Sequence, residues 1–315
     1  MTAIQFQNLP DTQQQQKDTL SHLGLVCITI SQQVRFRTMT RTRYLKLSDV
    51  QQESALRELY QHNLQRLHDA LSFCENNNIS LYRMSSALFP LSDMEDEIGA
   101  NILEEMSADL GKIGERSQAL GIRMVLHPDQ FVVLSSDSPE VVQTSIKILE
   151  RHARTLDLLG LPQSPWSLMN IHGGKSQRSE QLIKVISELP EAIKSRLTLE
   201  NDEYAYSASE ILAVCQQAGI PMVFDAHHHI CHEKLDSYDD PSVASMLYAA
   251  RATWANPEWQ LVHISNGETA FDDRKHSDLI TAMPNVYHEV RWIEVEAKRK
   301  EEAIANLRSW WLMGQ

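Results

Sequence analysis

The residues best suited to chemistry follow an apolar, β-type run, Val223-Phe224-Asp225-Ala226-His227-His228-His229. A strand that ends abruptly in a carboxylate and imidazoles is typical of a metal site built at the strand's carboxyl end. Asp225 and His228 are spaced to bind one ion together, whereas we expect His227 and His229 to point elsewhere. Taken alone, the stretch could also be a His-rich loop without a function.

The same arrangement recurs along the chain, which weakens that second interpretation. Six consecutive predicted strands each end in an imidazole or a carboxylate, a pattern that chance rarely produces, so we expect one shared metal site. The candidate ligands are His127, His172, Glu200, Asp225, His228, His263, His276 and Glu296. The candidate catalytic residues among them are Glu200, His263 and Glu296.

Five histidines and three carboxylates are more ligands than one ion needs. Because carboxylates can bridge, we expect two or three divalent ions. Mixed imidazole and carboxylate ligands suit Mn²⁺, Zn²⁺ or Fe²⁺ better than Mg²⁺ alone. Ions held together in this way can activate water at neutral pH and polarise a phosphate, so the ligand set favours phosphodiester hydrolysis. The sequence offers no Ser-His-Asp or Cys-His arrangement that would favour a covalent route.

Eight short apolar runs alternate with helical patterns, and these elements must position the ligands. The predicted strands cover 23–30, 79–84, 122–126, 167–171, 196–199, the run from Val223, 259–262 and 292–295. A first long helix is predicted to start after Ser48. Further helices are predicted over 98–120, 139–159, 179–193, 207–218 and 301–311.

This alternation is typical of parallel βαβ units, and eight units predict a closed (β/α)8 TIM barrel. We expect a single catalytic domain over 23–315, preceded by a polar extension over 1–22. An open doubly wound sheet is the alternative, which we disfavour because no glycine-rich phosphate loop follows the first strand. In a barrel the carboxyl ends of all strands meet at one face, where the ligands would converge.

The net charge of -13 argues against a nucleic-acid partner, because phosphate binding favours a basic surface. Bound divalent cations would offset several carboxylates. Positive charge is also concentrated in one segment without acidic residues, which contains Arg35, Arg37, Arg41, Arg43 and Lys46. This basic segment is either a solvated loop or a phosphate-binding surface.

Composition also bears on location. We expect no membrane span, because no run of about 18 apolar residues occurs, and the N-terminus lacks the pattern of a signal peptide. Four cysteines without paired spacing indicate reduced thiols and a cytoplasmic protein. No feature of the sequence points to an obligate protein partner.

Several motifs occur together and in a fixed order between Leu23 and Lys300. They are Gly24, His127-Pro128-Asp129-Gln130-Phe131, His172-Gly173-Gly174, Leu199-Glu200-Asn201-Asp202-Glu203, Asp225-Ala226-His227-His228 and Val295-Glu296-Ala297-Lys298. On these motifs the chain resembles the UV damage endonuclease family, which is similar to endonuclease IV and the xylose isomerase type of barrel. The resemblance implies a manganese-linked repair enzyme that incises DNA immediately 5′ of a UV photolesion, and it implies the same eight metal ligands.

The resemblance also implies DNA contacts. In the family a glutamine and a tyrosine probe the kinked duplex, and Gln130 and Phe131 stand at those positions. Phenylalanine can still act as a wedge, which needs only an apolar face. Because a photodimer already unstacks double-stranded DNA, such a wedge can select substrates by deformability. We expect the basic segment, with Lys175 and Arg178, to hold phosphates.

Three positions depart from the family pattern. Leu261 stands where members can carry a modified lysine that joins the metal site, Leu25 replaces an aromatic residue, and Ala87 replaces a polar or basic one. These changes either weaken lesion handling or mark a branch with an altered substrate range.

Two other functions remain open on the sequence. A sugar isomerase or epimerase on the same barrel would use the same ligand types and fits the acidic charge, but it does not explain the clustered arginines. A non-catalytic, metal-stabilised binding module fits less well, because the ligands lie on a rim and not in a compact structural knot.

Overall fold

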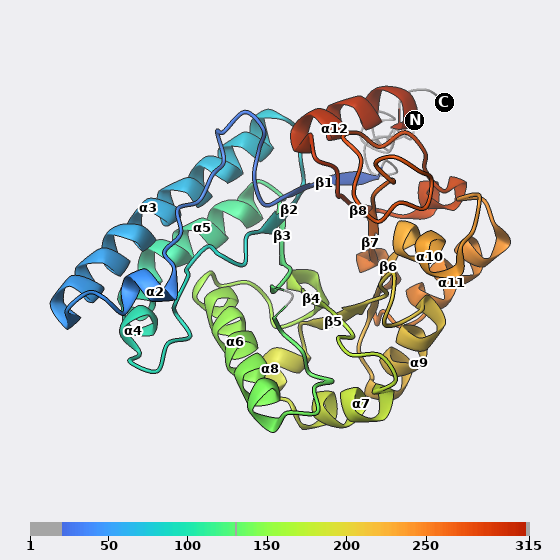
Figure 1. Cartoon of the computed structure of the whole chain (residues 1–315). Coiled ribbons are helices and arrows are strands. Elements are labelled where there is room, and N and C mark those ends of the chain that lie inside the picture. Colours follow the sequence, from blue (N-terminus) through green and yellow to red (C-terminus); the bar gives the residue numbers. More distant parts are fainter. Residues whose placement is uncertain (1–20, 130, 313–315) are drawn as a thin grey trace, which may run out of the picture.

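Eight parallel strands close into a barrel in the computed structural model, which describes residues 21–129 and 131–312. The strands are β1 (His22–Val26), β2 (Leu81–Met84), β3 (Arg123–Leu126), β4 (Met169–His172), β5 (Leu197–Glu200), β6 (Met222–Asp225), β7 (Leu261–Ile264) and β8 (Trp292–Val295). Each strand pairs with the next, and β1 pairs with β8. Figure 1 shows the strands in a ring with helices around it. The predicted (β/α)8 barrel is confirmed, and the open sheet is excluded.

The strands are short and almost wholly buried, because a barrel strand faces the interior on one side and the surrounding helices on the other. One group of side chains forms an apolar layer: Leu81, Val125, Leu168, Val223, Trp254, Leu261 and Trp292. Leu261 is therefore a packing residue in this chain.

Helices alternate with the strands. Their bounds are α2 (Arg41–Tyr44), α3 (Asp49–Asn76), α4 (Ile98–Glu105), α5 (Ser107–Ala119), α6 (Pro139–Leu158), α7 (Ser179–Glu188), α8 (Glu191–Lys194), α9 (Ala208–Ala218), α10 (Ala226–Glu233), α11 (Pro241–Arg251) and α12 (Lys300–Leu307). The predicted helix starts are confirmed where a side chain caps them: Ser138 accepts a hydrogen bond at the start of α6, and Ser207 forms a capping box with Glu210 at α9.

Several predicted boundaries were wrong. The helix expected over 98–120 is divided at Met106, whose ψ of 6° leaves the helical range. The helix expected over 179–193 is interrupted at Pro190, which cannot donate a backbone hydrogen bond. The first strand, expected to reach Ile30, ends at Val26, and α12 passes into a π-helix over Arg308–Leu312.

The predicted N-terminal extension over 1–22 lies outside the described residues, except Ser21 and His22. The basic segment lies between β1 and α3, and its central part forms the short helix α2. Of the helices in the described part of the chain, none is long and apolar enough to cross a membrane.

Two glycines of α5 provide a matched test of the helix packing. A Cβ atom on Gly114 would lie 1.6 Å from the carbonyl oxygen of Leu159 at the end of α6, whereas a Cβ atom on Gly111 would meet no atom within 4 Å. Gly114→Ala should therefore lower the free energy of unfolding by about 1–3 kcal/mol or more. Gly111→Ala should raise it by about 0.5–1 kcal/mol through helix propensity. Urea denaturation measures both, and equal effects would contradict the packing described here.

Candidate metal centre

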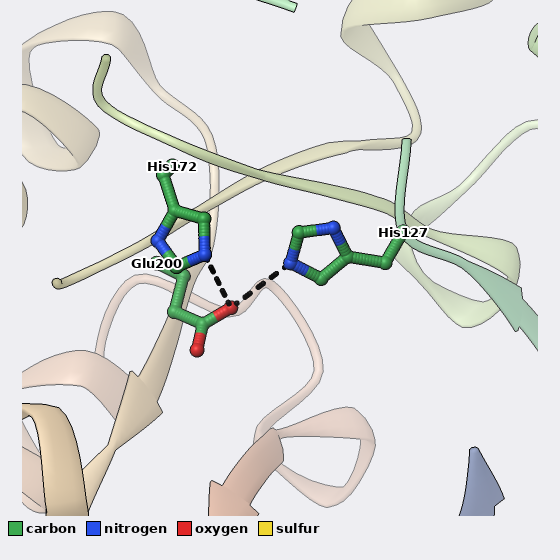
Figure 2. A group of neighbouring side chains, drawn as sticks. All are labelled: His127, His172 and Glu200. Atoms are coloured by element: carbon green, nitrogen blue, oxygen red, sulfur yellow. Dashed lines mark hydrogen bonds and ion pairs between the residues drawn. The ribbon is translucent and has the colours of Figure 1, made fainter. Parts of the chain in front are cut away.

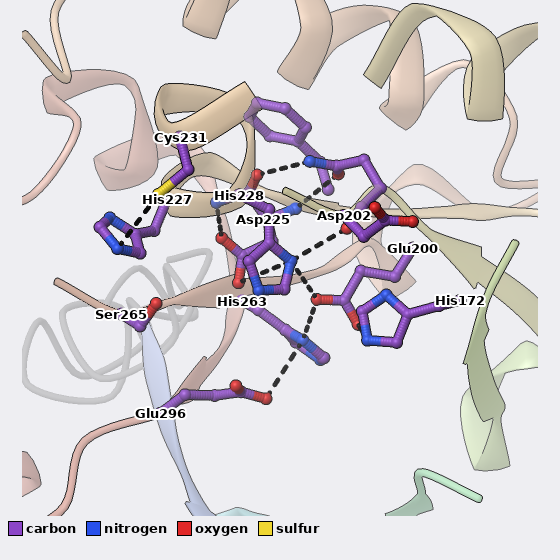
Figure 3. Close-up of polar contacts among 12 residues, drawn as sticks. His172, Glu200, Asp202, Asp225, His227, His228, Cys231, His263, Ser265 and Glu296 are labelled. Atoms are coloured by element: carbon purple, nitrogen blue, oxygen red, sulfur yellow. Dashed lines mark hydrogen bonds and ion pairs between the residues drawn. The ribbon is translucent and has the colours of Figure 1, made fainter. Parts of the chain in front are cut away.

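Three overlapping groups of potential ligands lie at the carboxyl ends of the strands. They are His127, His172 and Glu200; Glu200, Asp225 and His228; and Asp225, His263 and Glu296. Within each group, one ligand atom per residue lies within 4.8 Å of the others. Glu200 belongs to two groups and so does Asp225, so each carboxylate is common to two candidate ion sites. Figures 2 and 3 show these side chains pointing toward one another.

The barrel positions these residues because the carboxyl ends of all its strands lie at the same face. His172, Glu200 and Asp225 are the last residues of β4, β5 and β6, and Glu296 directly follows β8. Asp225 has a second role, since it is the N-cap of α10 and accepts a hydrogen bond of 2.8 Å from the backbone N–H of His228. The cap thus fixes the helix that carries another ligand of the same group.

Glu200 lies at the centre of the cluster and is buried. Its Oε2 lies 3.3 Å from His127 Nε2 and 4.0 Å from His172 Nε2. Its Oε1 lies 3.0 Å from His263 Nδ1 and 3.2 Å from His228 Nδ1. One carboxylate therefore faces four imidazoles that come from four different parts of the chain.

The charges of the cluster shift its protonation. Burial alone would raise the pKa of Glu200, but His263 and His172 hold it well below its usual range. Burial would lower the pKa of His228, but Asp225 and Glu200 raise it well above the ordinary value. The pKa of His263 is raised in the same way by Glu200 and Glu294, against the effect of burial. Without bound cations the cluster therefore retains protons on these imidazoles.

The residues fit a bound divalent cation. Asp225 is fully buried, and no hydrogen-bond partner for its Oδ2 occurs among the described residues. A buried carboxylate oxygen without a partner is costly, and a cation would satisfy it. The mixture of imidazole nitrogens and carboxylate oxygens suits Mn²⁺, Zn²⁺ or Fe²⁺.

His276 is the one predicted ligand that belongs to none of the three groups formed by described residues. Its Nδ1 lies 3.9 Å from Oε2 of Glu296, and a bridge between Gly267 and His276 holds the loop that carries it. The residue therefore lies at the edge of the cluster.

Sequence reasoning missed two charged residues, Arg83 and Glu294. Arg83 Nη1 donates to Glu294 over 2.8 Å and to Glu296 over 2.5 Å. Oε2 of Glu294 lies 2.9 Å from Nε2 of His263, so Glu294 helps to orient this ring. The other ring nitrogen of His263, Nδ1, faces Glu200. Glu294 could have been found from its spacing, because it lies on β8 two residues before Glu296, and side chains two apart along an extended chain point to the same face.

The residues predicted to contact DNA differ in their exposure and in their ion pairs. Phe131 is 72% exposed in the loop after β3, while Gln130 lies outside the described residues. Arg178 Nε lies 2.8 Å and Lys175 Nζ 3.9 Å from the carboxylate of Asp137, which offsets part of their charge. The arginines of the basic segment, Arg35, Arg37, Arg41 and Arg43, are exposed.

Two of the three residues that depart from the family pattern pack in the core of the barrel. Leu261 and Leu25 are fully buried apolar residues, and Ala87 is half-buried. Leu261 thus brings no group that could bind a metal ion. Its strand neighbour His263 instead pairs in register with Glu294, which supplies a buried carboxylate beside the cluster.

Comparisons with known proteins agree with this geometry. The model of the family described as UV-endonuclease UvdE matches residues 21–313. The chain is 79% identical, over all of its length and 98% of the relative, to a UV DNA damage endonuclease of Nostoc sp.. It is 48% identical to the UV DNA damage endonuclease of Deinococcus radiodurans, over 92% of this chain and 96% of that one.

Solved structures give the same result. The structure named SacUVDE matches with a TM-score of 0.78 and 27% identity, over 92% of this chain and 98% of that one. Endonuclease IV from Thermus thermophilus matches with a TM-score of 0.57 and 15% identity, over 79% of this chain and 95% of that one, which shows a shared fold. The sequence matches, which cover almost the whole chain, establish that it belongs to the UV-endonuclease UvdE family.

Proposed function

We propose that this protein is a metal-dependent DNA repair endonuclease that incises double-stranded DNA immediately 5′ of UV photolesions. The observation that carries the proposal is the set of three ligand groups joined by Glu200 and Asp225 at the rim of the barrel. The high identity to relatives named UV DNA damage endonucleases supports the substrate class.

The eight predicted ligands would hold two or three divalent ions, for which Mn²⁺ is favoured and Zn²⁺ is the alternative. When bound, such ions supply Lewis-acid stabilisation of the phosphate and lower the pKa of a coordinated water to about 7. Glu200, His263 and Glu296 are proposed as catalytic residues because they lie together: Nδ1 of His263 is 3.0 Å from Oε1 of Glu200 and 3.4 Å from Oε1 of Glu296. Arg83 and Glu294 would keep Glu296 and His263 in place as the ions bind.

The surroundings of the cluster support binding of distorted DNA. Phe131 is exposed on the same rim and can wedge between bases that a lesion has already unstacked. The exposed arginines of the basic segment, together with Lys175 and Arg178, would contact phosphates. We also propose a cytoplasmic location, supported by four free cysteines. No obligate protein partner is proposed.

A nicking assay on UV-irradiated and plain supercoiled plasmid tests the function. With Mn²⁺ we expect nicks in the irradiated plasmid only, and none when a chelator is added, because the cluster depends on divalent ions. Mapping of an end-labelled strand should place each nick on the 5′ side of the lesion. Equal nicking of both plasmids would indicate a general nuclease, and conversion of an aldose to a ketose without nicking would favour a sugar isomerase or epimerase.

Glu200→Gln should abolish nicking. The amide removes the charge that two ligand groups share, so the loss should exceed the roughly 10- to 100-fold effect typical of residues that only orient a ligand. The matched control is Glu258→Gln, which changes an exposed carboxylate just before β7, at the opposite end of the barrel. Circular dichroism checks that both variants fold, and full nicking activity in Glu200→Gln would remove this residue from the site.

The stability of the metal-free protein should fall as the pH rises above about 6.5. His228 and His263 have raised pKa values in the fold, so their stabilising contribution is complete below the ordinary value of 6.5 and is lost as the pH rises through the raised values. Divalent ions displace these protons, so the stabilisation by Mn²⁺ should grow over the same range. Thermal unfolding with chelator and with Mn²⁺, from pH 6 to 9, measures both trends. A Mn²⁺ effect that is independent of pH would contradict the proposed ligands.

A further inference from the structure

An exposed tyrosine and an arginine from distant parts of the chain stack on each other at the rim. Tyr204 is 67% exposed in the loop between β5 and α9, and the guanidinium carbon of Arg274 lies 4.0 Å from the centre of its ring. Arg274 belongs to the loop after β7. Both loops leave the carboxyl ends of strands, so the pair lies on the face that carries the metal cluster.

Helix α10 anchors both loops. The side chain of Asp202 accepts a hydrogen bond of 2.8 Å from the N–H of Tyr204, and the backbone carbonyl of Asp202 lies 3.1 Å from Nδ1 of His232 on α10. In the other loop, the carbonyl of Asp273 lies 2.8 Å from Nε2 of His227, also on α10. The hydrogen bonds to α10 therefore fix the backbones of the two loops that carry the Tyr204–Arg274 stack.

The polar groups of this stack are unused. Across residues 21–129 and 131–312, neither the hydroxyl of Tyr204 nor the guanidinium of Arg274 has a hydrogen bond or an ion pair within the structure. A second Tyr–Arg pair, on α11, differs: the Tyr248 hydroxyl donates to Glu289, and Arg251 donates to Gln260. The rim stack thus leaves a ring surface, a hydroxyl and a cation available to a ligand.

The position of the stack suggests the ligand. In a ring of eight strands, β1 and β5 lie opposite each other, so the basic segment after β1 lies across the mouth of the barrel from Tyr204. A duplex laid over the cluster would contact both sides. On the side away from the basic segment, Arg274 would then supply a positive charge for the duplex. Such a charge matters in a protein whose net charge is -13.

We propose that the Tyr204–Arg274 stack is a binding site for an unstacked nucleobase of the DNA substrate. The exposed ring surface of Tyr204 would stack on the base, which needs no particular base identity because every base has a π-face. The guanidinium of Arg274 would pair with an adjoining phosphate. This proposal rests on the proposed function, and it adds a contact distinct from that of Phe131.

The test uses the metal-loaded protein and a duplex with one unpaired 2-aminopurine beside the incision site, whose fluorescence falls when the base stacks. We expect quenching before incision in the wild type and in Tyr204→Phe, which retains the ring. Tyr204→Ala should lose the quenching and raise KM about ten-fold, with kcat little changed. Arg274→Ala should reduce the slope of log binding constant against log salt by about one.

Tyr248→Ala is the matched control, because it removes an exposed tyrosine that also lies beside an arginine. It should leave quenching and KM unchanged. The stacking site alone would be overturned if Tyr204→Ala showed the same quenching and the same KM as the wild type and nicked irradiated plasmid normally. A wild-type protein that neither binds the duplex nor nicks irradiated plasmid would overturn the proposed function and the stacking site with it.

Discussion

The rest of the site depends on one buried carboxylate, that of Glu200, which faces imidazoles on both of its oxygen atoms. Its charge favours the protonated forms of two of these imidazoles: with Asp225 and Glu294 it raises the pKa of His228 and of His263 against the effect of burial. Asp225 extends the arrangement, because it faces a second group of ligands and also caps the helix that carries His228. Shared carboxylates and barrel geometry together explain why potential ligands so distant in sequence lie within reach of one another.

Arg83 and Glu294 lie beside the cluster and balance its charge, although neither belongs to a ligand group. Arg83 neutralises Glu294 and Glu296, and burial would otherwise raise the pKa of both carboxyls. Glu294 then orients His263. This arrangement keeps the carboxylates ionised before ions bind, so the cost of assembling the charges is met during folding.

Much of the site could be predicted because barrel topology turns sequence position into spatial position. A ligand at the end of each strand must reach the same face, so His127, Glu200 and Asp225 could be grouped from their strands alone. Details that depend on neighbouring elements could not be predicted in this way. The helical path of 226–233, the break at Met106 and the pairing of Arg178 with Asp137 each depend on contacts between segments far apart in the chain.

We propose that Glu200 and Asp225 would each contact two metal ions within one cluster. Anomalous diffraction from crystals grown with Mn²⁺, recorded near the manganese edge, tests it most directly. We expect two or three peaks inside the cluster, with each of these carboxylates in contact with two neighbouring ions. A single peak bound by one of the three ligand groups, or ions bound only elsewhere on the barrel, would contradict it.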